Sequence, residues 1–77
     1  MDVYAELADF LATAIDERVG PDDDYFALGL ANSLFALELV SFVEQRFHLT
    51  ISVDDLDLDH FRTLNRLTDF VHAKTAA

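Results

Sequence analysis

Ser33 is the residue whose type and setting could support chemistry. A serine hydroxyl acts as a nucleophile only with a general base in hydrogen-bonding reach, and residues 30–34, Leu-Ala-Asn-Ser-Leu, lack the Gly-x-Ser-x-Gly turn of serine hydrolases. Asn32 and Ser33 are both helix-capping residue types and precede a predicted helix. A phosphate on Ser33 would be favoured by the positive end of that helix. Two roles therefore remain for Ser33, a helix cap or the acceptor of a group that another enzyme attaches.

The histidines and the alternating carboxylates do not make a metal site. The three histidines lie twelve residues apart, so no two share a helix face as ligands, and the chain has no Cys: His48, His60 and His72. Asp55, Asp57 and Asp59 alternate as in a calcium loop, but His60 stands where such a loop needs Gly and Arg66 where it needs Glu. We therefore predict no bound metal and interpret the carboxylates as solvated.

Three amphipathic stretches predict the helices that position Ser33. Apolar residues recur at three- and four-residue intervals over residues 3–17 and from Leu34 to Phe47, and a last helix follows a cap at Thr63. Gly20-Pro21 breaks the first pattern, and residues 19–31 predict a long loop, a feature more often functional than idle. Four apolar residues could pin this loop to the core: Tyr25, Phe26, Leu28 and Leu30. A short helical turn is predicted after Ser52 or Asp54.

The fold class expected from these elements is all-α, a bundle of three main helices and one short helix with the long loop between helices 1 and 2. On the second helix one broad arc is apolar apart from Arg46: Phe35, Ala36, Leu39, Val40, Phe42, Val43 and Phe47. The opposite arc mixes two leucines with polar residues: Leu34, Leu37, Glu38, Ser41, Glu44 and Gln45. This pattern predicts an exposed apolar patch rimmed by carboxylates beside Ser33.

Length and charge limit the classes of function. Seventy-seven residues predict a single domain spanning residues 1–77, and 52% apolar residues exclude an acidic disordered tail. Five Lys and Arg against fifteen Asp and Glu give a net charge of −10, which argues against nucleic acid and anionic membrane as partners. Residues 19–60 hold nine of the acids and one base, so a basic partner would be steered toward Ser33. Without Cys or a long apolar run we expect a cytoplasmic monomer.

Residues 26–47 resemble the phosphopantetheine attachment motif of acyl and peptidyl carrier proteins, which runs Leu-Gly-x-Asp-Ser-Leu-x-x-x-Glu-Leu. The resemblance covers nearly the whole chain and implies the family's four-helix fold. It also implies that a phosphopantetheinyl transferase attaches 4'-phosphopantetheine from coenzyme A to Ser33. Such a protein is not an enzyme, and acyltransferase, adenylation or ligase, and ketosynthase enzymes would be its further partners. Asn32 departs from the motif, which has Asp there, and this puts the identity of the docking partner in question.

The resemblance further implies a docking surface around Ser33: Asn32, Leu34, Leu37, Glu38, Ser41, Glu44, Asp57 and Asp59. Residues 33–37 and 56–63 look like discrete carriers of bacterial polyketide or nonribosomal peptide pathways, which hold alkoxymalonyl-type units or activated amino acids. The second segment is also similar to D-alanyl carrier proteins. The function expected is a free-standing carrier that holds an acyl or aminoacyl thioester and delivers it to biosynthetic enzymes, with polyketide assembly favoured. The alternatives are a D-alanyl-type or fatty-acid-type carrier and a non-carrier acidic helical adaptor.

Overall fold

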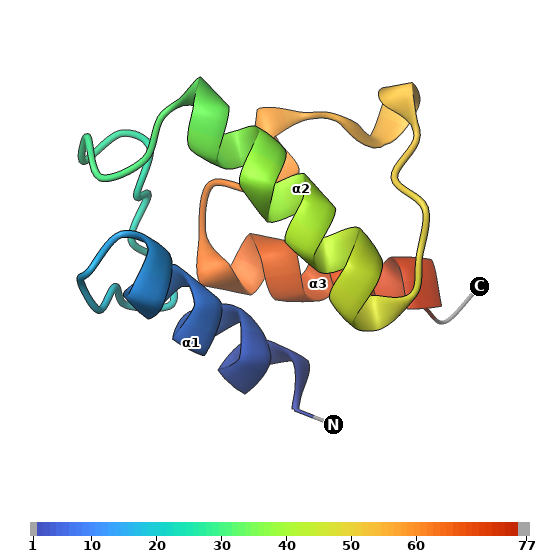
Figure 1. Cartoon of the computed structure of the whole chain (residues 1–77), viewed down its shortest axis with the longest axis horizontal. Helices are drawn as coiled ribbons and strands as arrows, with labels where there is room; N and C mark the ends of the chain where they lie inside the picture. The colour runs from blue at the N-terminus through green and yellow to red at the C-terminus, as the bar shows by residue number, and fades with distance from the viewer. Residues whose placement is uncertain (1, 76–77) are drawn as a thin grey trace.

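The computed structural model describes residues 2–75 and contains three α-helices, α1 (Val3–Ala14), α2 (Ser33–Phe47) and α3 (Leu64–Thr75). Two 3₁₀ turns, η1 (Val53–Asp55) and η2 (Leu58–His60), lie between α2 and α3. No strand occurs among the described residues, which confirms the all-α class. Figure 1 shows α2 crossing α3, with the long loop joining α1 to α2 at one end and the η1–η2 segment on the other side of α2.

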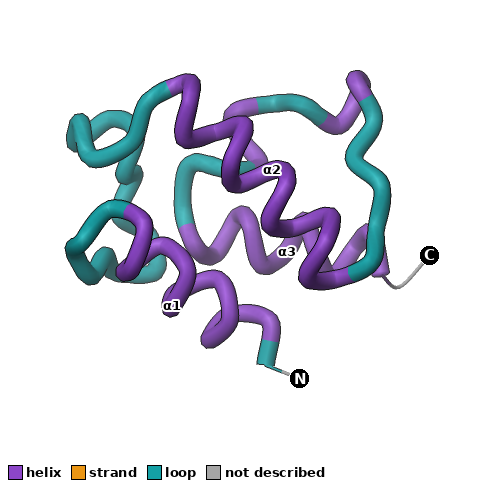
Figure 2. The backbone as a smooth tube through the Cα atoms, viewed as in Figure 1, coloured by secondary structure: helices purple, strands orange, loops and turns teal. Residues whose placement is uncertain are grey.

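The boundaries differ from the sequence prediction in two places. The first helix ends at Ala14 rather than at residue 17, because Ile15 closes it and Asp16 takes a left-handed φ of 54°. The predicted short helix is instead two separate 3₁₀ turns, which Figure 2 shows as short helical segments in an extended connection. Ser52 begins η1 in a capping box with Asp55, so Asp54 is not the cap, and Asp57 caps η2.

The core forms where the three helices meet. Its buried apolar residues come from all three helices, the long loop and the residue after η2: Leu7, Leu11, Tyr25, Phe35, Leu39, Val43, Phe61, Leu64, Leu67, Phe70 and Val71. The predicted apolar faces of α2 and α3 are therefore confirmed. Thr63 accepts the Arg66 amide at 3.1 Å, as expected of the cap of α3. The expectation that Leu28 pins the loop is wrong, since its side chain is 61% exposed, whereas Tyr25 is fully buried.

Helices α1 and α2 are joined by aromatic and ionic contacts. The Phe10 ring stacks on Phe42 with centroids 4.0 Å apart. The Arg46 guanidinium donates to both carboxylate oxygens of Glu6 at 2.7 and 2.9 Å, which holds the pKa of Glu6 below its ordinary value. Arg46, the charged residue on the apolar arc of α2, thus has its partner on α1.

Candidate functional site

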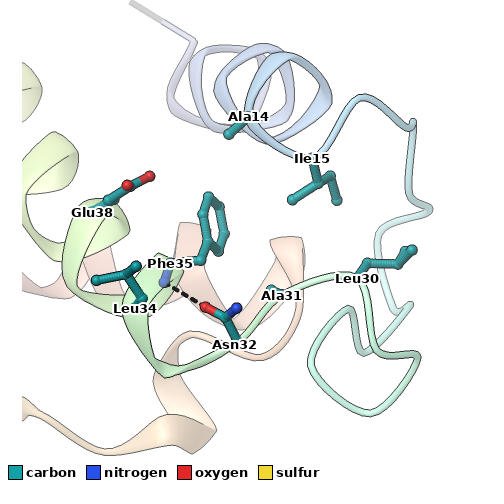
Figure 3. Close-up of a pocket in the computed structure, with 8 residues that line it drawn as sticks. All are labelled: Ala14, Ile15, Leu30, Ala31, Asn32, Leu34, Phe35 and Glu38. Carbon is teal, nitrogen blue, oxygen red and sulfur yellow. Dashed lines mark hydrogen bonds between the residues drawn. The ribbon is translucent and has the colours of Figure 1, made fainter.

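The first turn of α2 presents Ser33 without using it as a cap. Asn32 is the N-cap: its backbone is extended, and its Oδ1 accepts the Phe35 amide at 3.0 Å, the dashed line in Figure 3. Ser33 is the first helical residue and is exposed, and its hydroxyl makes no hydrogen bond with any residue in the range 2–75. The interpretation of Ser33 as a cap is therefore wrong. Both residue types can cap, and Asn32 takes the role one position earlier.

The electrostatic setting of Ser33 suits a phosphate ester. The unpaired backbone amides at a helix N-terminus carry partial positive charge, which stabilises an anion placed there. No acidic residue lies in the first turn of α2, every residue of which the structure describes. Asn32 caps without adding a negative charge, which the usual aspartate would do. The exposed hydroxyl, the absence of an acidic residue from the first turn of α2 and the neutral cap together fit 4'-phosphopantetheine on Ser33.

The long loop fixes where α2 begins. Tyr25 lies inside the core and its hydroxyl donates to the Phe61 carbonyl, while its own carbonyl accepts the amides of Leu30 and Ala31 at 2.9 and 3.1 Å. Burial raises the pKa of Tyr25, with the nearby Asp24 carboxylate adding to the effect. Asp24 itself accepts two amides of the next turn. One buried tyrosine therefore ties the residues that lead into Ser33 to the chain just before α3.

The predicted docking residues of α2 divide into free and engaged side chains. Leu34 and Leu37 are 68% and 66% exposed, as the patch prediction required, and Glu38 is exposed beside them. Glu44 is half-buried and its carboxylate accepts the Ile51 amide at 2.8 Å, which fixes the chain after α2. The Ser41 hydroxyl accepts a weak hydrogen bond from the side-chain amide Nε2 of Gln45 at 3.3 Å. Of the two glutamates only Glu38 is free to meet a partner, and its docking role stays a prediction.

Asp57 and Asp59 belong to the η1–η2 segment, and Asp57 lines a groove together with residues of α2. Asp57 accepts the Asp59 amide at 3.0 Å, and Asp59 pairs with Arg62 at 2.8 Å. Arg62 also reaches Asp24 of the long loop at 3.1 Å. Both aspartates are exposed, but Asp59 is already neutralised by a cation. Their part in docking also stays a prediction.

Two shallow grooves flank α2. The long-loop groove has a volume of about 250 Å³, and Figure 3 shows the ring of Phe35 directed from α2 toward α1 within it. Its lining comes from the end of α1, the loop and the start of α2: Ala14, Ile15, Leu30, Ala31, Asn32, Leu34, Phe35 and Glu38. The 53–58 groove, on the other edge of α2, has a volume of about 240 Å³. Its lining is almost wholly apolar: Ala36, Leu37, Val40, Leu56, Asp57, Leu58 and Phe61.

Sequence reasoning missed the exposed apolar residues of this second groove. Leu56 and Leu58 are 52% and 46% exposed, and neither was predicted to dock. The sequence pattern that could have indicated them is the alternation of Leu with Asp over residues 56–59, which is typical of an extended segment with one apolar side. In the structure both leucines line the open groove opposite α2.

The structure brings no metal ligands together. Across residues 2–75 no three side chains of His, Cys, Asp or Glu gather closely enough to hold an ion. His48 ends α2 in a left-handed conformation, and His60 stacks on Phe70 with ring centroids 5.0 Å apart. Asp55, from the calcium-like alternation, is held by Lys74 at 2.7 Å and by Ser52, and these contacts lower its pKa to about 2. None of the described helices is long and apolar enough to span a membrane.

Known proteins match the sequence over most of the chain. The family model described as a phosphopantetheine attachment site matches residues 2–71. The D-alanyl carrier protein of Leuconostoc mesenteroides subsp. mesenteroides is 30% identical over 69 residues, which cover 87% of this chain and 88% of the relative. The D-alanyl carrier protein of Bacillus velezensis is 31% identical over 72 residues, which cover 90% and 92%.

A segment of the beauvericin nonribosomal cyclodepsipeptide synthetase of Gibberella fujikuroi is 40% identical over 55 residues, 71% of this chain but 2% of that protein. The family model thus matches most of the chain, and two of these relatives are named as carriers. The chain therefore belongs to the acyl and peptidyl carrier protein family. Its cofactor is covalently attached 4'-phosphopantetheine.

Proposed function

We propose that this chain is a free-standing carrier, one domain over residues 1–77, whose 4'-phosphopantetheine arm is attached to Ser33. The observation that carries the proposal is the exposed Ser33 hydroxyl, which makes no hydrogen bond within residues 2–75. It lies in the first turn of α2, which holds no acidic residue, and Asn32 takes the capping role. When bound, the arm supplies a thiol that holds an acyl or aminoacyl group as a thioester. The chain itself catalyses no step and depends on partner enzymes.

Attachment is a phosphoryl transfer from coenzyme A. The Ser33 hydroxyl oxygen attacks the phosphorus that bears the pantetheine, forming a new O–P bond. The bond from that phosphorus to adenosine 3',5'-bisphosphate breaks, and the serine proton passes to a base on the transferase. Ser33 needs no base of its own in this scheme, which agrees with its exposed position at the surface.

The test is the mass of the intact protein after incubation with coenzyme A and a broad-specificity phosphopantetheinyl transferase. The wild type should gain one phosphopantetheine, and Ser33→Ala should gain none. Ser33→Thr tests the adaptor alternative, since it keeps a hydroxyl at the helix start; an adaptor would keep its function in cells, and a carrier would lose it. A wild type that stays unmodified under conditions that convert a known carrier would sink the proposal.

We further propose that the cargo is an amino acid. The relatives named D-alanyl carrier proteins and the nonribosomal peptide synthetase segment support this choice, and the polyketide context expected from the sequence stays a prediction. Holo protein incubated with D-alanine, ATP and a D-alanine-activating ligase should gain one alanyl group, released by hydroxylamine. Loading by a malonyl-type acyltransferase instead, with no aminoacyl product from any of the amino acids, would overturn the choice.

A further inference from the structure

The long loop is held against the start of α3 by contacts between residues far apart in the chain. The Asn65 amide donates to the Pro21 carbonyl at 3.0 Å, and its side-chain nitrogen donates to Asp22 at 2.9 Å. The Tyr25 hydroxyl donates to the Phe61 carbonyl. Every residue of the loop is described, and Tyr25 alone among them is buried. The loop therefore gains little from apolar packing and depends on polar contacts for its position.

Arg62 adds an ionic contact that joins the loop to η2. Its Nη1 lies 2.8 Å from Oδ1 of Asp59, and its Nε lies 3.1 Å from Oδ2 of Asp24. The Nε atom is shielded from solvent, so this ion pair is screened less than one at the open surface. The other carboxylate oxygen of Asp24 accepts the amides of Phe26 and Ala27 at 3.1 and 2.9 Å. One guanidinium thus fixes the carboxylate around which the loop turns toward α2.

The loop is connected to Ser33 by a second set of hydrogen bonds. The Tyr25 carbonyl accepts the amides of Leu30 and Ala31 at 2.9 and 3.1 Å, and the next residue, Asn32, caps α2. Ser33 follows directly, with an exposed side chain. A displacement at Tyr25 is therefore transmitted to the chain that enters α2 and to the position of Ser33.

Phosphoryl transfer to Ser33 requires that its hydroxyl oxygen be placed accurately. The attacking oxygen must lie in line with the bond from phosphorus to the leaving group, and a misplacement of about 1 Å can lower a rate by up to about 10²-fold. The predicted docking residues of α2, by contrast, form no hydrogen bond or ion pair with Arg62 within residues 2–75. Loosening the loop should therefore slow the chemical step more than it weakens binding of an enzyme.

We propose that Arg62 is a positioning residue for the modification of Ser33. Its guanidinium holds Asp24 and Asp59 together, and this keeps the long loop and the start of α2 in the orientation in which the Ser33 hydroxyl meets the phosphorus of coenzyme A. Arg62 touches neither the substrate nor Ser33 and acts through the loop. The inference rests on the proposed function of Ser33 as the attachment residue.

The test measures kcat and KM of Ser33 modification separately, with coenzyme A and a broad-specificity phosphopantetheinyl transferase. Arg62→Gln should lower kcat about fivefold and leave the KM for the carrier within about twofold, because the hydroxyl is misplaced while the exposed surface of α2 is unchanged. Arg66→Gln is the matched control. It removes the same charge from an exposed arginine of α3 that forms no ion pair within residues 2–75, so its kcat should stay within about twofold of the wild type.

Three more variants test whether Arg62 acts through Asp24. Asp24→Asn keeps an oxygen for the amides of the next turn but loses the ion pair, so it should also lower kcat about fivefold. The double variant Asp24→Asn/Arg62→Gln should be no slower than either single variant, because both changes remove the same contact. Arg62→Lys keeps the charge, but its ammonium lacks the planar fork that bridges two carboxylates. Its kcat should lie between those of the wild type and Arg62→Gln.

Amide hydrogen exchange distinguishes positioning from a general loss of stability. In Arg62→Gln the amides of Leu30 and Ala31 should exchange about fivefold faster, whereas amides in the middle of α1 should keep their wild-type rates. Equal acceleration throughout the chain would overturn the inference, because Arg62 would then stabilise the whole fold rather than the loop.

The kinetic results can also contradict the inference. A kcat of Arg62→Gln equal to that of Arg66→Gln would overturn it, and so would a higher KM with unchanged kcat, which would make Arg62 a docking residue. Additive losses in the double variant would exclude the route through Asp24. If circular dichroism shows that Arg62→Gln is unfolded, Arg62→Lys and Asp24→Asn decide by the same criteria. A wild type that is never modified contradicts the proposed function itself and is thereby distinguished from these results.

Discussion

Tyr25→Phe removes a single hydroxyl from the core, and the structure gives the expected loss of stability. The Tyr25 hydroxyl donates to the Phe61 carbonyl, and both residues are buried, with exposed fractions of 0% and 4%. Without this donor a buried acceptor loses its partner, at a cost of about 1–3 kcal/mol. A chain of this size has a free energy of unfolding of roughly 4–11 kcal/mol, so the loss is a large part of it.

Urea unfolding followed by circular dichroism measures this loss, and a thermal scan should show Tm lowered by about 4–8 °C for each kcal/mol. Tyr4→Phe is the matched control: Tyr4 is half-buried, and its hydroxyl has no hydrogen-bond partner within residues 2–75, so its change should stay within about 0.5 kcal/mol. Equal effects of the two variants would refute the reasoning, because burial of the hydrogen bond would then contribute nothing.

The same tyrosine predicts a loss of stability in alkali. Burial raises the pKa of folded Tyr25 above its ordinary value of 10.0. The stabilisation is therefore fully present below pH 10 and is lost as the pH rises above it, where the unfolded chain ionises first. The free energy of unfolding should therefore fall above pH 10 in the wild type. It should fall less in Tyr25→Phe, and an identical decline in both proteins would contradict the assignment.

Three further predictions concern caps and ion pairs. The Lys74 ammonium and Ser52 lower the pKa of Asp55 from 3.8 to about 2, so the stability that this carboxylate contributes above pH 3.8 should decline as the pH falls toward 2. Urea unfolding across that pH range should show a shallower decline in Asp55→Asn. His48 has a left-handed φ of 55°, so His48→Gly should raise the free energy of unfolding by up to about 1 kcal/mol. His72→Gly, at an exposed position within α3, should lower it by about as much. Thermal scans in which both variants shifted Tm in the same direction would contradict this. Asn32→Ala should cost about 1 kcal/mol by loss of the cap, while Asn32→Asp should not, and a thermal scan that ranked them equally would count against the capping geometry.

The helices and their buried faces could be predicted because apolar residues recur at the helical interval in each of them. Phe35, Leu39 and Val43 recur at the helical interval and all are buried, and α3 follows the same rule. The end of α1 could not be read, because nothing in residues 14–17 marks Asp16 as left-handed; glycine and asparagine are the usual signals. The short helix was predicted wrongly for a related reason: one turn that begins at Ser52 and another that begins at Asp57 look like one helix when only capping residues are counted.

The sequence singles out Ser33 as the candidate attachment residue, but it does not predict the geometry around that residue. Ser33 stands out in the sequence, yet the choice of cap between Asn32 and Ser33 depends on one backbone dihedral angle that both residue types tolerate. The pairing of Asp55 with Lys74 joins residues far apart in the chain, and no local pattern encodes it. The groove beside Leu58 depends on how the η1–η2 segment lies against α2, which only the folded chain determines.

The separation of the cap from the modified residue has a consequence for the unmodified protein. Because Asn32 caps α2, the start of the helix does not depend on a group attached to Ser33. If Ser33 is the attachment residue, as proposed, the chain should therefore fold before it is modified and already present α2 to its partner enzymes. In a cell that modified only part of its carrier chains, the unmodified chains would be folded but would carry no arm. The rate of the pathway would then depend on the ratio of apo to holo chains as well as on their total amount.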